Sequence, residues 1–152
     1  MKKSVILIIT TLSLVAIILI GLIFQRAEVY NVTVYVKDII CTSVRIGDEY
    51  YKTYLASDNY YKIENSEKPG SFLTLPYFPE LTIDIIYEVR PFDASNQSVS
   101  FYTDPNSLIA KIDAETGRIV FLDEGTETFT VRANDNSNIS ARIKLRAKIP
   151  EA

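Results

Sequence analysis

The 152-residue sequence contains no histidine, no tryptophan and only one cysteine, Cys41. Without histidine there is no Ser-His-Asp or Cys-His catalysis, no histidine general base and no imidazole metal ligand. One thiol forms neither an intramolecular disulfide nor a thiolate zinc cluster. We expect Cys41 to be a small strand residue, with an intermolecular bridge as the alternative in an oxidising compartment. Because nothing in the sequence brings two carboxylates to a shared cleft, we predict no catalytic residues, no metal and no cofactor.

Charge is nearly missing from the N-terminus, where Lys2, Lys3 and Arg26 are the only charged residues of the first 26. Of the 16 Lys and Arg in the chain, these three leave 13 for residues 27–152, against 19 Asp and Glu, which gives a net charge of −6. Nucleic-acid partners require a basic face. The balance therefore argues against nucleic-acid binding.

The uncharged run at residues 4–24 is the longest apolar segment of the chain. As a helix it would span about 31 Å, which matches a hydrocarbon core of about 30 Å. A cleaved signal has a shorter apolar region, of about 7–15 residues, followed by a small-x-small site. We therefore predict that residues 1–26 are an uncleaved single-pass anchor in the cell membrane, with a cleaved signal as the alternative. Lys2 and Lys3 predict a cytoplasmic N-terminus and an extracytoplasmic domain over residues 27–152.

Beyond residue 27, apolar and polar residues alternate with a period of two, which is typical of strands with one buried face. Turn sequences such as "DASNQ", "DPNS" and "NDNSN" separate the segments. Strand spacings of roughly 8–12 residues predict an all-β sandwich. The predicted strands are residues 30–37, 81–90, 99–103, 108–112, 118–122, 126–133 and 139–148.

Two acidic sequences, "DAETG" at 113–117 and "DEGT" at 123–126, lie between predicted strands. Gly117 and Gly125 can adopt the positive φ that tight hairpins require, so we interpret both sequences as corners. A calcium site at Asp113 and Glu115 is the alternative. It would need six to eight oxygen ligands, so turn chemistry is the favoured interpretation.

Residues 87–145 resemble the bacterial immunoglobulin-like domain of group 2, found in surface proteins and adhesins of the intimin and invasin type. The matching elements are a proline with A-S-N, an aromatic strand carrying phenylalanine where tryptophan is common, a D…A-x-I element, a G-x-I hairpin and a G-T-x-x-F-x-V strand. They lie at Pro91, 94–96, Phe101, 104–112, 117–119 and 125–131. The resemblance implies an immunoglobulin-like antiparallel β-sandwich at a cell surface. It implies no particular ligand and no catalytic residues.

The family pattern does not explain residues 38–79, which we interpret as a tyrosine-rich insertion. Tyrosine suits interfaces because it combines a large apolar face with a polar tip. Three uses are open: docking a partner protein or glycan, packing extra strands onto the sandwich, and resting on the membrane interface. The candidate binding residues are Tyr50, Tyr51, Tyr54, Tyr60, Tyr61, Tyr77 and Phe78, with Phe72 among them in sequence.

Near the C-terminus, Arg132, Arg142, Lys144 and Arg146 are predicted to form a cationic stripe. Such a stripe can hold anionic wall polymers or lipid headgroups. The plainer interpretation is a solvated face whose charges prevent edge-to-edge aggregation.

Together these features predict a membrane-anchored cell-envelope protein. Its extracytoplasmic domain would act in binding, adhesion or spacing at the cell surface, without catalysis, and its partner would be a protein or a cell-wall glycan. The alternative is an accessory subunit of a membrane protein complex, in which helix and domain both contact the partner.

Overall fold

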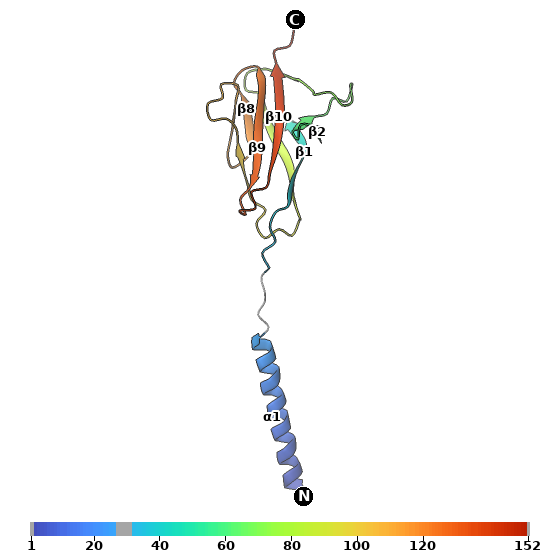
Figure 1. Ribbon diagram of the computed structural model, residues 1–152, viewed down its shortest axis with the longest axis vertical. Helices are drawn as coiled ribbons and strands as arrows, with labels where there is room; N and C mark the ends of the chain where they lie inside the picture. Colours follow the sequence, from blue (N-terminus) through green and yellow to red (C-terminus); the bar gives the residue numbers. More distant parts are fainter. Residues whose placement is uncertain (1, 27–31, 152) are drawn as a thin grey trace. The chain divides into compact units, whose positions relative to one another are not determined.

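The computed structural model describes residues 2–26 and 32–151, which belong to two separate units, an N-terminal helix and a β domain that begins at Thr33 (Figure 1). Helix α1 is Lys2–Arg26. Within it, Lys2–Leu22 is long and apolar enough to cross a membrane, a test that a signal sequence also passes. The hydroxyls of Thr10 and Ser13 donate to carbonyls one turn earlier, at 3.0 and 2.9 Å, which satisfies them inside an apolar helix.

The β domain contains ten strands in its described residues. They are β1 (Asp38–Ile46), β2 (Glu49–Leu55), β3 (Tyr61–Ile63), β4 (Leu75–Pro76), β5 (Thr82–Arg90), β6 (Val99–Tyr102), β7 (Ala110–Ile112), β8 (Arg118–Phe121), β9 (Gly125–Ala133) and β10 (Ser140–Lys148). The prediction of an all-β domain preceded by one N-terminal helix is confirmed.

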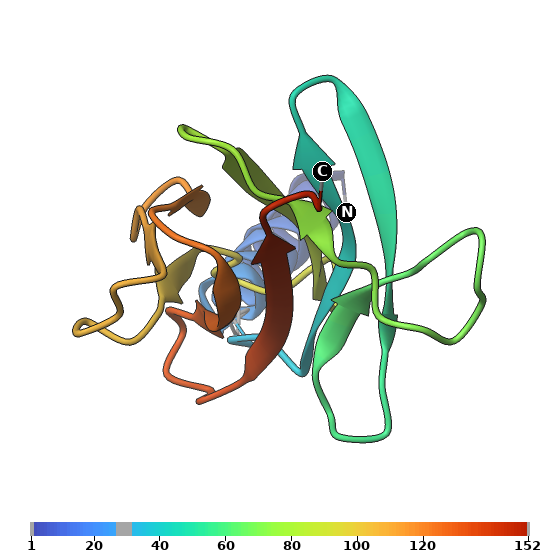
Figure 2. The same ribbon diagram turned by 90° about the horizontal axis from the view of Figure 1, so that it is seen from above.

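Seven of these strands form two antiparallel layers. Sheet I has the order β1-β5-β8-β7, and sheet II has the order β6-β9-β10. This is the ABED and CFG arrangement of a constant-type immunoglobulin sandwich. The remaining strands depart from it: β2 and β3 join the two layers beside β1 and β10 (Figure 2), and β3 and β4 pair with β10 in parallel.

The core lies between the two sheets and is built by alternation. Inward side chains of β5, β8, β9 and β10 are almost fully buried. Phe121 of sheet I and Phe129 of sheet II meet edge to face, with ring centroids 6.4 Å apart. Phe101 is also buried, and its ring centroid lies 5.7 Å from that of Tyr87 in sheet I. Rings from both layers therefore tie the sheets together.

The predicted strands from residue 81 onward are confirmed within one or two residues, but the first one is wrong. The described part of that segment, 32–37, is irregular, and residues 30 and 31 lie outside the described residues. Two of its amides bind loop side chains: that of Val36 donates to Asp135 Oδ2 at 2.5 Å, and that of Val34 to Ser95 Oγ at 2.9 Å. The amide of Lys37 bonds to the carbonyl of Arg90 at 2.8 Å, at the end of β5 and just before β1 begins.

The true first strand is β1, which begins where the predicted insertion was placed. It pairs along its length with β5 of the core, so the segment added to the immunoglobulin pattern is residues 47–79, not 38–79. Cys41 is buried in β1, and burial raises the pKa of its thiol to about 12, which makes it unreactive. The prediction of a small strand residue there is confirmed.

The acidic corners have the predicted geometry. Gly117 has φ 72°, and a Cβ there would lie 2.5 Å from the ring of Phe101, so the position requires glycine twice over. Asp113 Oδ1 accepts hydrogen bonds from the amides of Thr116 (2.7 Å) and Glu115 (3.0 Å). These bonds, with that from the Thr116 hydroxyl, hold the pKa of Asp113 below its usual value. The Asp113 carboxylate therefore stabilises its own turn through these hydrogen bonds.

Candidate functional site

Two features that the sequence kept apart, the cationic stripe and the aromatic segment, meet on the outer face of sheet II. Alternation along β10 buries Ala141, Ile143, Leu145 and Ala147 and directs the intervening residues outward. The outward cations lie directly across from threonines of β9: Arg142 opposite Thr130, Lys144 opposite Thr128 and Arg146 opposite Thr126. A row of cations therefore runs beside a row of hydroxyls.

Two aromatic rings from the added segment lie against these cations. The ring centroid of Tyr60 is 4.5 Å from Arg142 Cζ and 4.2 Å from Lys144 Nζ. The ring of Phe72 is 4.8 Å from Arg146 Cζ and 5.8 Å from the Nζ of Lys62. These are cation–π distances, and each ring contacts two cations. We call the set formed by Tyr60, Lys62, Phe72, Arg142, Lys144 and Arg146 the cation–aromatic face.

The charges of this face are only partly neutralised. Asp58, from the turn between β2 and β3, lies 2.8 Å from Lys62 Nζ and 3.8 Å from Lys144 Nζ. The hydrogen bond from Lys62 is the main reason that the pKa of Asp58 is lowered. Arg142 and Arg146 form no ion pair with any residue that the structure describes. The outward positions of β9 and β10 contain no carboxylate.

The fourth predicted cation of the stripe lies at its edge. Arg132 is outward on β9 opposite Ser140, and its guanidinium donates to Asn138 Oδ1 at 2.8 Å. Lys62 and Asp58 belong to the site but were not predicted. The alternation of "YKI" at residues 61–63 places Lys62 on the face opposite the buried Ile63. This alternation is the sequence pattern from which an outward Lys62 could have been predicted.

The structure divides the other predicted aromatics among different regions. Tyr54 lies opposite Lys62 in the β2–β3 pair, and Tyr61 packs against the core. Tyr50 is 64% exposed opposite Arg45 of β1, away from β10. Tyr51 also lies on β2, and its hydroxyl donates to Glu49 Oε2 at 2.5 Å, the main cause of its raised pKa.

The last two predicted aromatics follow β4. The hydroxyl of Tyr77 donates to the carbonyl of Leu122 at 2.9 Å, and its amide bonds to the carbonyl of Lys148 at the end of β10. Phe78 is exposed next to it. The seven candidate residues are thus spread over the domain, and only Tyr60 belongs to the cation–aromatic face.

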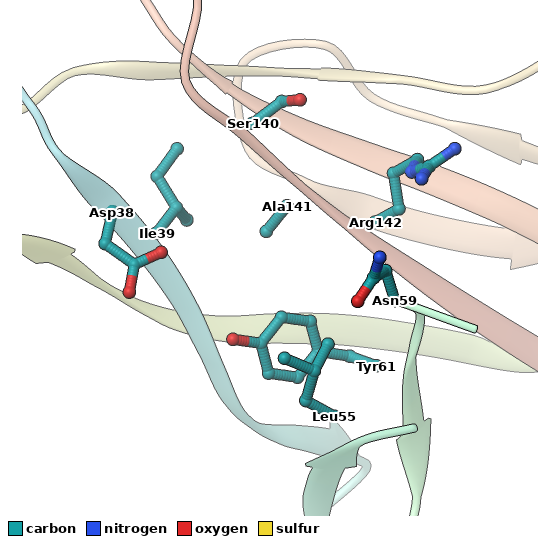
Figure 3. A pocket seen from close by; sticks show the side chains of 8 residues that line it. All are labelled: Asp38, Ile39, Leu55, Asn59, Tyr61, Ser140, Ala141 and Arg142. Atoms are coloured by element: carbon teal, nitrogen blue, oxygen red, sulfur yellow. The ribbon is translucent and has the colours of Figure 1, made fainter. Parts of the chain in front are cut away.

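A cavity of about 420 Å³ adjoins this face at the start of β10 (Figure 3). Its walls come from the first residues of β1, the turn between β2 and β3, and the first residues of β10. Asp38, Tyr61 and Arg142 supply its acidic, phenolic and cationic groups, and Ile39 and Leu55 supply apolar surface. This lining suits the binding of a polar group beside the cations of β10.

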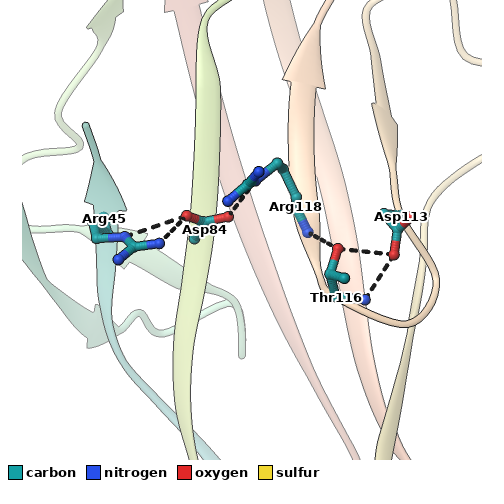
Figure 4. Close-up of polar contacts among 5 residues, drawn as sticks. All are labelled: Arg45, Asp84, Asp113, Thr116 and Arg118. Atoms are coloured by element: carbon teal, nitrogen blue, oxygen red, sulfur yellow. Dashed lines mark hydrogen bonds and ion pairs between the residues drawn. The ribbon is translucent and has the colours of Figure 1, made fainter. Parts of the chain in front are cut away.

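The outer face of sheet I has a different arrangement (Figure 4). Asp84 lies between two arginines, with Oδ2 2.6 Å from Arg45 Nη2 and Oδ1 3.0 Å from Arg118 Nε. Partial burial alone would raise the pKa of Asp84, but the hydrogen bonds from Arg118 and Arg45 outweigh it and lower the pKa. Each charge in this row therefore has an internal partner.

Among the described residues, no group of three or more His, Cys, Asp or Glu side chains is placed to hold a metal ion. The chain matches no protein-family model and no curated protein sequence. Function is therefore inferred from the fold and from the chemistry of its surfaces.

Proposed function

We propose that the chain is a membrane-anchored envelope protein whose β domain acts outside the cytoplasm by binding or spacing at the cell surface, without catalysis. The observation that carries this proposal is the combination of one membrane-length apolar helix with an immunoglobulin-ordered sandwich that follows it after a few residues. The sequence resemblance to group 2 bacterial immunoglobulin-like domains supports the same assignment. Such scaffolds act through sites on their surfaces.

Cysteine labelling of whole cells tests the topology. Cys41 is buried with a raised pKa, so it gives little background with a maleimide that cannot cross membranes. We expect Ser66→Cys, in an exposed loop of the domain, to be labelled on intact bacterial cells. Ser4→Cys, at the start of α1, should be labelled only after the cells are permeabilised.

The reversed labelling pattern would exclude the proposed orientation. Loss of the Ser4→Cys label from the mature chain, while the domain is still found outside, would show that the helix is a cleaved signal. Both outcomes are read on the full chain and require no knowledge of the ligand.

A second candidate function is that of an accessory subunit in a membrane complex. It is favoured by exposed apolar side chains at the end of the domain opposite Thr33. Leu122 (47% exposed) and Phe78 (49%) lie near one another there, since Tyr77 bonds to the carbonyl of Leu122. Solubilisation in mild detergent followed by size analysis separates the candidates, because a subunit would migrate as a large complex of fixed stoichiometry. Phe78→Ser should dissociate such a complex.

A further inference from the structure

The cation–aromatic face is positive within a domain that is negative overall. Residues 27–152 have a net charge of −6, yet β10 presents Arg142, Lys144 and Arg146 on successive outward positions. Alternate residues of a strand are about 6.6 Å apart, so these like charges repel one another. Two of them have no ion pair among the described residues. The face therefore retains positive charge that a ligand can neutralise.

The rings beneath these cations orient them without neutralising them. A ring attracts a cation through its quadrupole and contributes no net charge. Arg142 also donates to the hydroxyl of Tyr60 at 3.2 Å, and Arg146 donates to Thr126 Oγ1 at 3.2 Å. Each contact uses one donor of a guanidinium that has five. The side chains are held in place with most of their donors still free, which lowers the entropy lost on binding.

We propose that the cation–aromatic face binds an extended, phosphate-bearing anionic polymer that lies along β10. Arginine forks bind phosphate through paired hydrogen bonds, and the row at Thr126, Thr128 and Thr130 adds hydroxyl donors beside each cation. This inference deepens the proposed function, on which it rests, because it names what the exposed domain holds.

The linear order of the cations favours a polymer over a lipid surface. From Arg142 to Arg146 the row extends about 13 Å along one strand. Strand β10 begins beside the turn that holds Val36 through Asp135, and it ends near the C-terminus. The row therefore leads away from the end of the domain where the chain arrives from α1. A membrane contact would be served better by cations gathered around that end.

The first test measures binding of long-chain inorganic polyphosphate to the full chain in nanodiscs of neutral phosphatidylcholine. We expect polyphosphate to bind, and inorganic phosphate at the same phosphorus concentration to bind at least tenfold more weakly. With three phosphate contacts, the logarithm of the affinity should fall with the logarithm of salt concentration with a slope of about −2. A slope near zero, or equal binding of the two probes, would overturn the proposal.

Matched variants locate the site. The triple variant Arg142→Gln, Lys144→Gln and Arg146→Gln should weaken polyphosphate binding at least tenfold. Its control, Arg90→Gln, Lys111→Gln and Arg118→Gln, removes the same charges from sheet I and should stay within threefold of the parent. Equal losses of polyphosphate affinity in both triple variants would show a general charge effect and would contradict the proposal. Since the triple variant also loses ring contacts, single Arg146→Gln gives a second measurement: it should reduce the salt slope by about 0.7.

Two further arms distinguish the chemistry of the ligand. Poly-glutamate of similar charge should bind at least threefold more weakly than polyphosphate, and equal binding would contradict the phosphate assignment. Nanodiscs containing phosphatidylglycerol should leave polyphosphate binding within threefold, and its loss there would show that lipid headgroups occupy the face instead. A negative result in any arm leaves the labelling experiment unaffected, so failure of this inference and failure of the proposed topology are distinguishable.

Discussion

On the outer face of sheet I, Asp84 lies between Arg45 and Arg118, whereas on the outer face of sheet II each β10 cation of the cation–aromatic face lies against one aromatic ring. The two faces belong to one sandwich and share one core. They differ in which residues the strand register makes neighbours. In sheet I, β5 places an acid opposite a base on both sides. In sheet II, β9 places threonines opposite the bases.

The difference shows that one scaffold can carry a face whose charges are paired with one another and a face whose positive charges are only partly neutralised. Opposite charges across strands satisfy each other, and they gain little from any outside ligand. Like charges backed by rings are ordered but not neutralised. The second arrangement suits a binding surface, and the first does not.

The largest effect on stability should come from a substitution in the core that the two faces share. Phe129→Ala removes a fully buried ring that contacts Phe121 across the core, so we expect the free energy of unfolding to fall by about 3–5 kcal/mol. Urea unfolding of the full chain in neutral detergent, followed by circular dichroism and tyrosine fluorescence, measures it. Phe92→Ala, at a ring that is 67% exposed, is the control and should cost under about 1 kcal/mol. Two separate transitions would contradict a common core.

A smaller effect on stability should follow from removing the central carboxylate of sheet I, which leaves its two arginine partners unpaired, as the described arginines of sheet II are. Asp84→Asn keeps the side-chain shape but leaves Arg45 and Arg118 without their carboxylate. Both arginines are partly exposed, so we expect a loss of about 1–1.5 kcal/mol in the free energy of unfolding. Asp48→Asn, at an exposed hairpin position, should change it by less than about 0.5 kcal/mol. Equal effects of the two substitutions would mean that the row contributes nothing.

The same row should respond to acid in a defined direction. Because the pKa of Asp84 is lowered in the folded domain, its stabilising effect is present above the unfolded value of 3.8 and is lost as pH falls through the folded pKa. The difference in unfolding free energy between the parent and Asp84→Asn should therefore be constant from pH 7 to about pH 5. It should shrink below pH 4 in urea titrations. A difference that persists undiminished at pH 2 would show that the ion pairs are not its cause.

The regular strands of both sheets could be predicted because hydrophobic alternation alone decides which way their side chains point. Strands β5 and β10 are the clearest cases. Strand β1 was missed because a bulge between Cys41 and Ser43 shifts its buried positions from Ile39 and Cys41 to Val44. The shift breaks the period of two in the sequence. The segment at 30–37 shows the opposite error: its alternation in sequence is intact, but in its described part the amides of Val34 and Val36 bind loop side chains.

The cations of β10 were predictable for the same reason, but the side chains that contact them were not. Tyr60 and Arg142 are 82 residues apart, and nothing local to either predicts their contact. They meet because β3 pairs with β10 in parallel while β2 pairs with both β1 and β3. Such long-range pairing depends on the whole topology. The sequence could therefore predict a cationic stripe and an aromatic segment, but not that they form one face.

The smallest expected effect tests whether the rings of sheet II organise its cations. Tyr60→Leu keeps an apolar side chain but removes the face on which Arg142 and Lys144 lie, so we expect a loss of about 0.5–1 kcal/mol in the free energy of unfolding. Tyr102→Leu is the control, because Tyr102 is exposed on the same sheet and has no cation–π contact among the described residues. If both variants unfold alike, the stacking is incidental, and the cations of sheet II are merely solvated. A loss specific to Tyr60→Leu would instead show that the face is held in order by its rings, as the ion pairs of Asp84 hold the other.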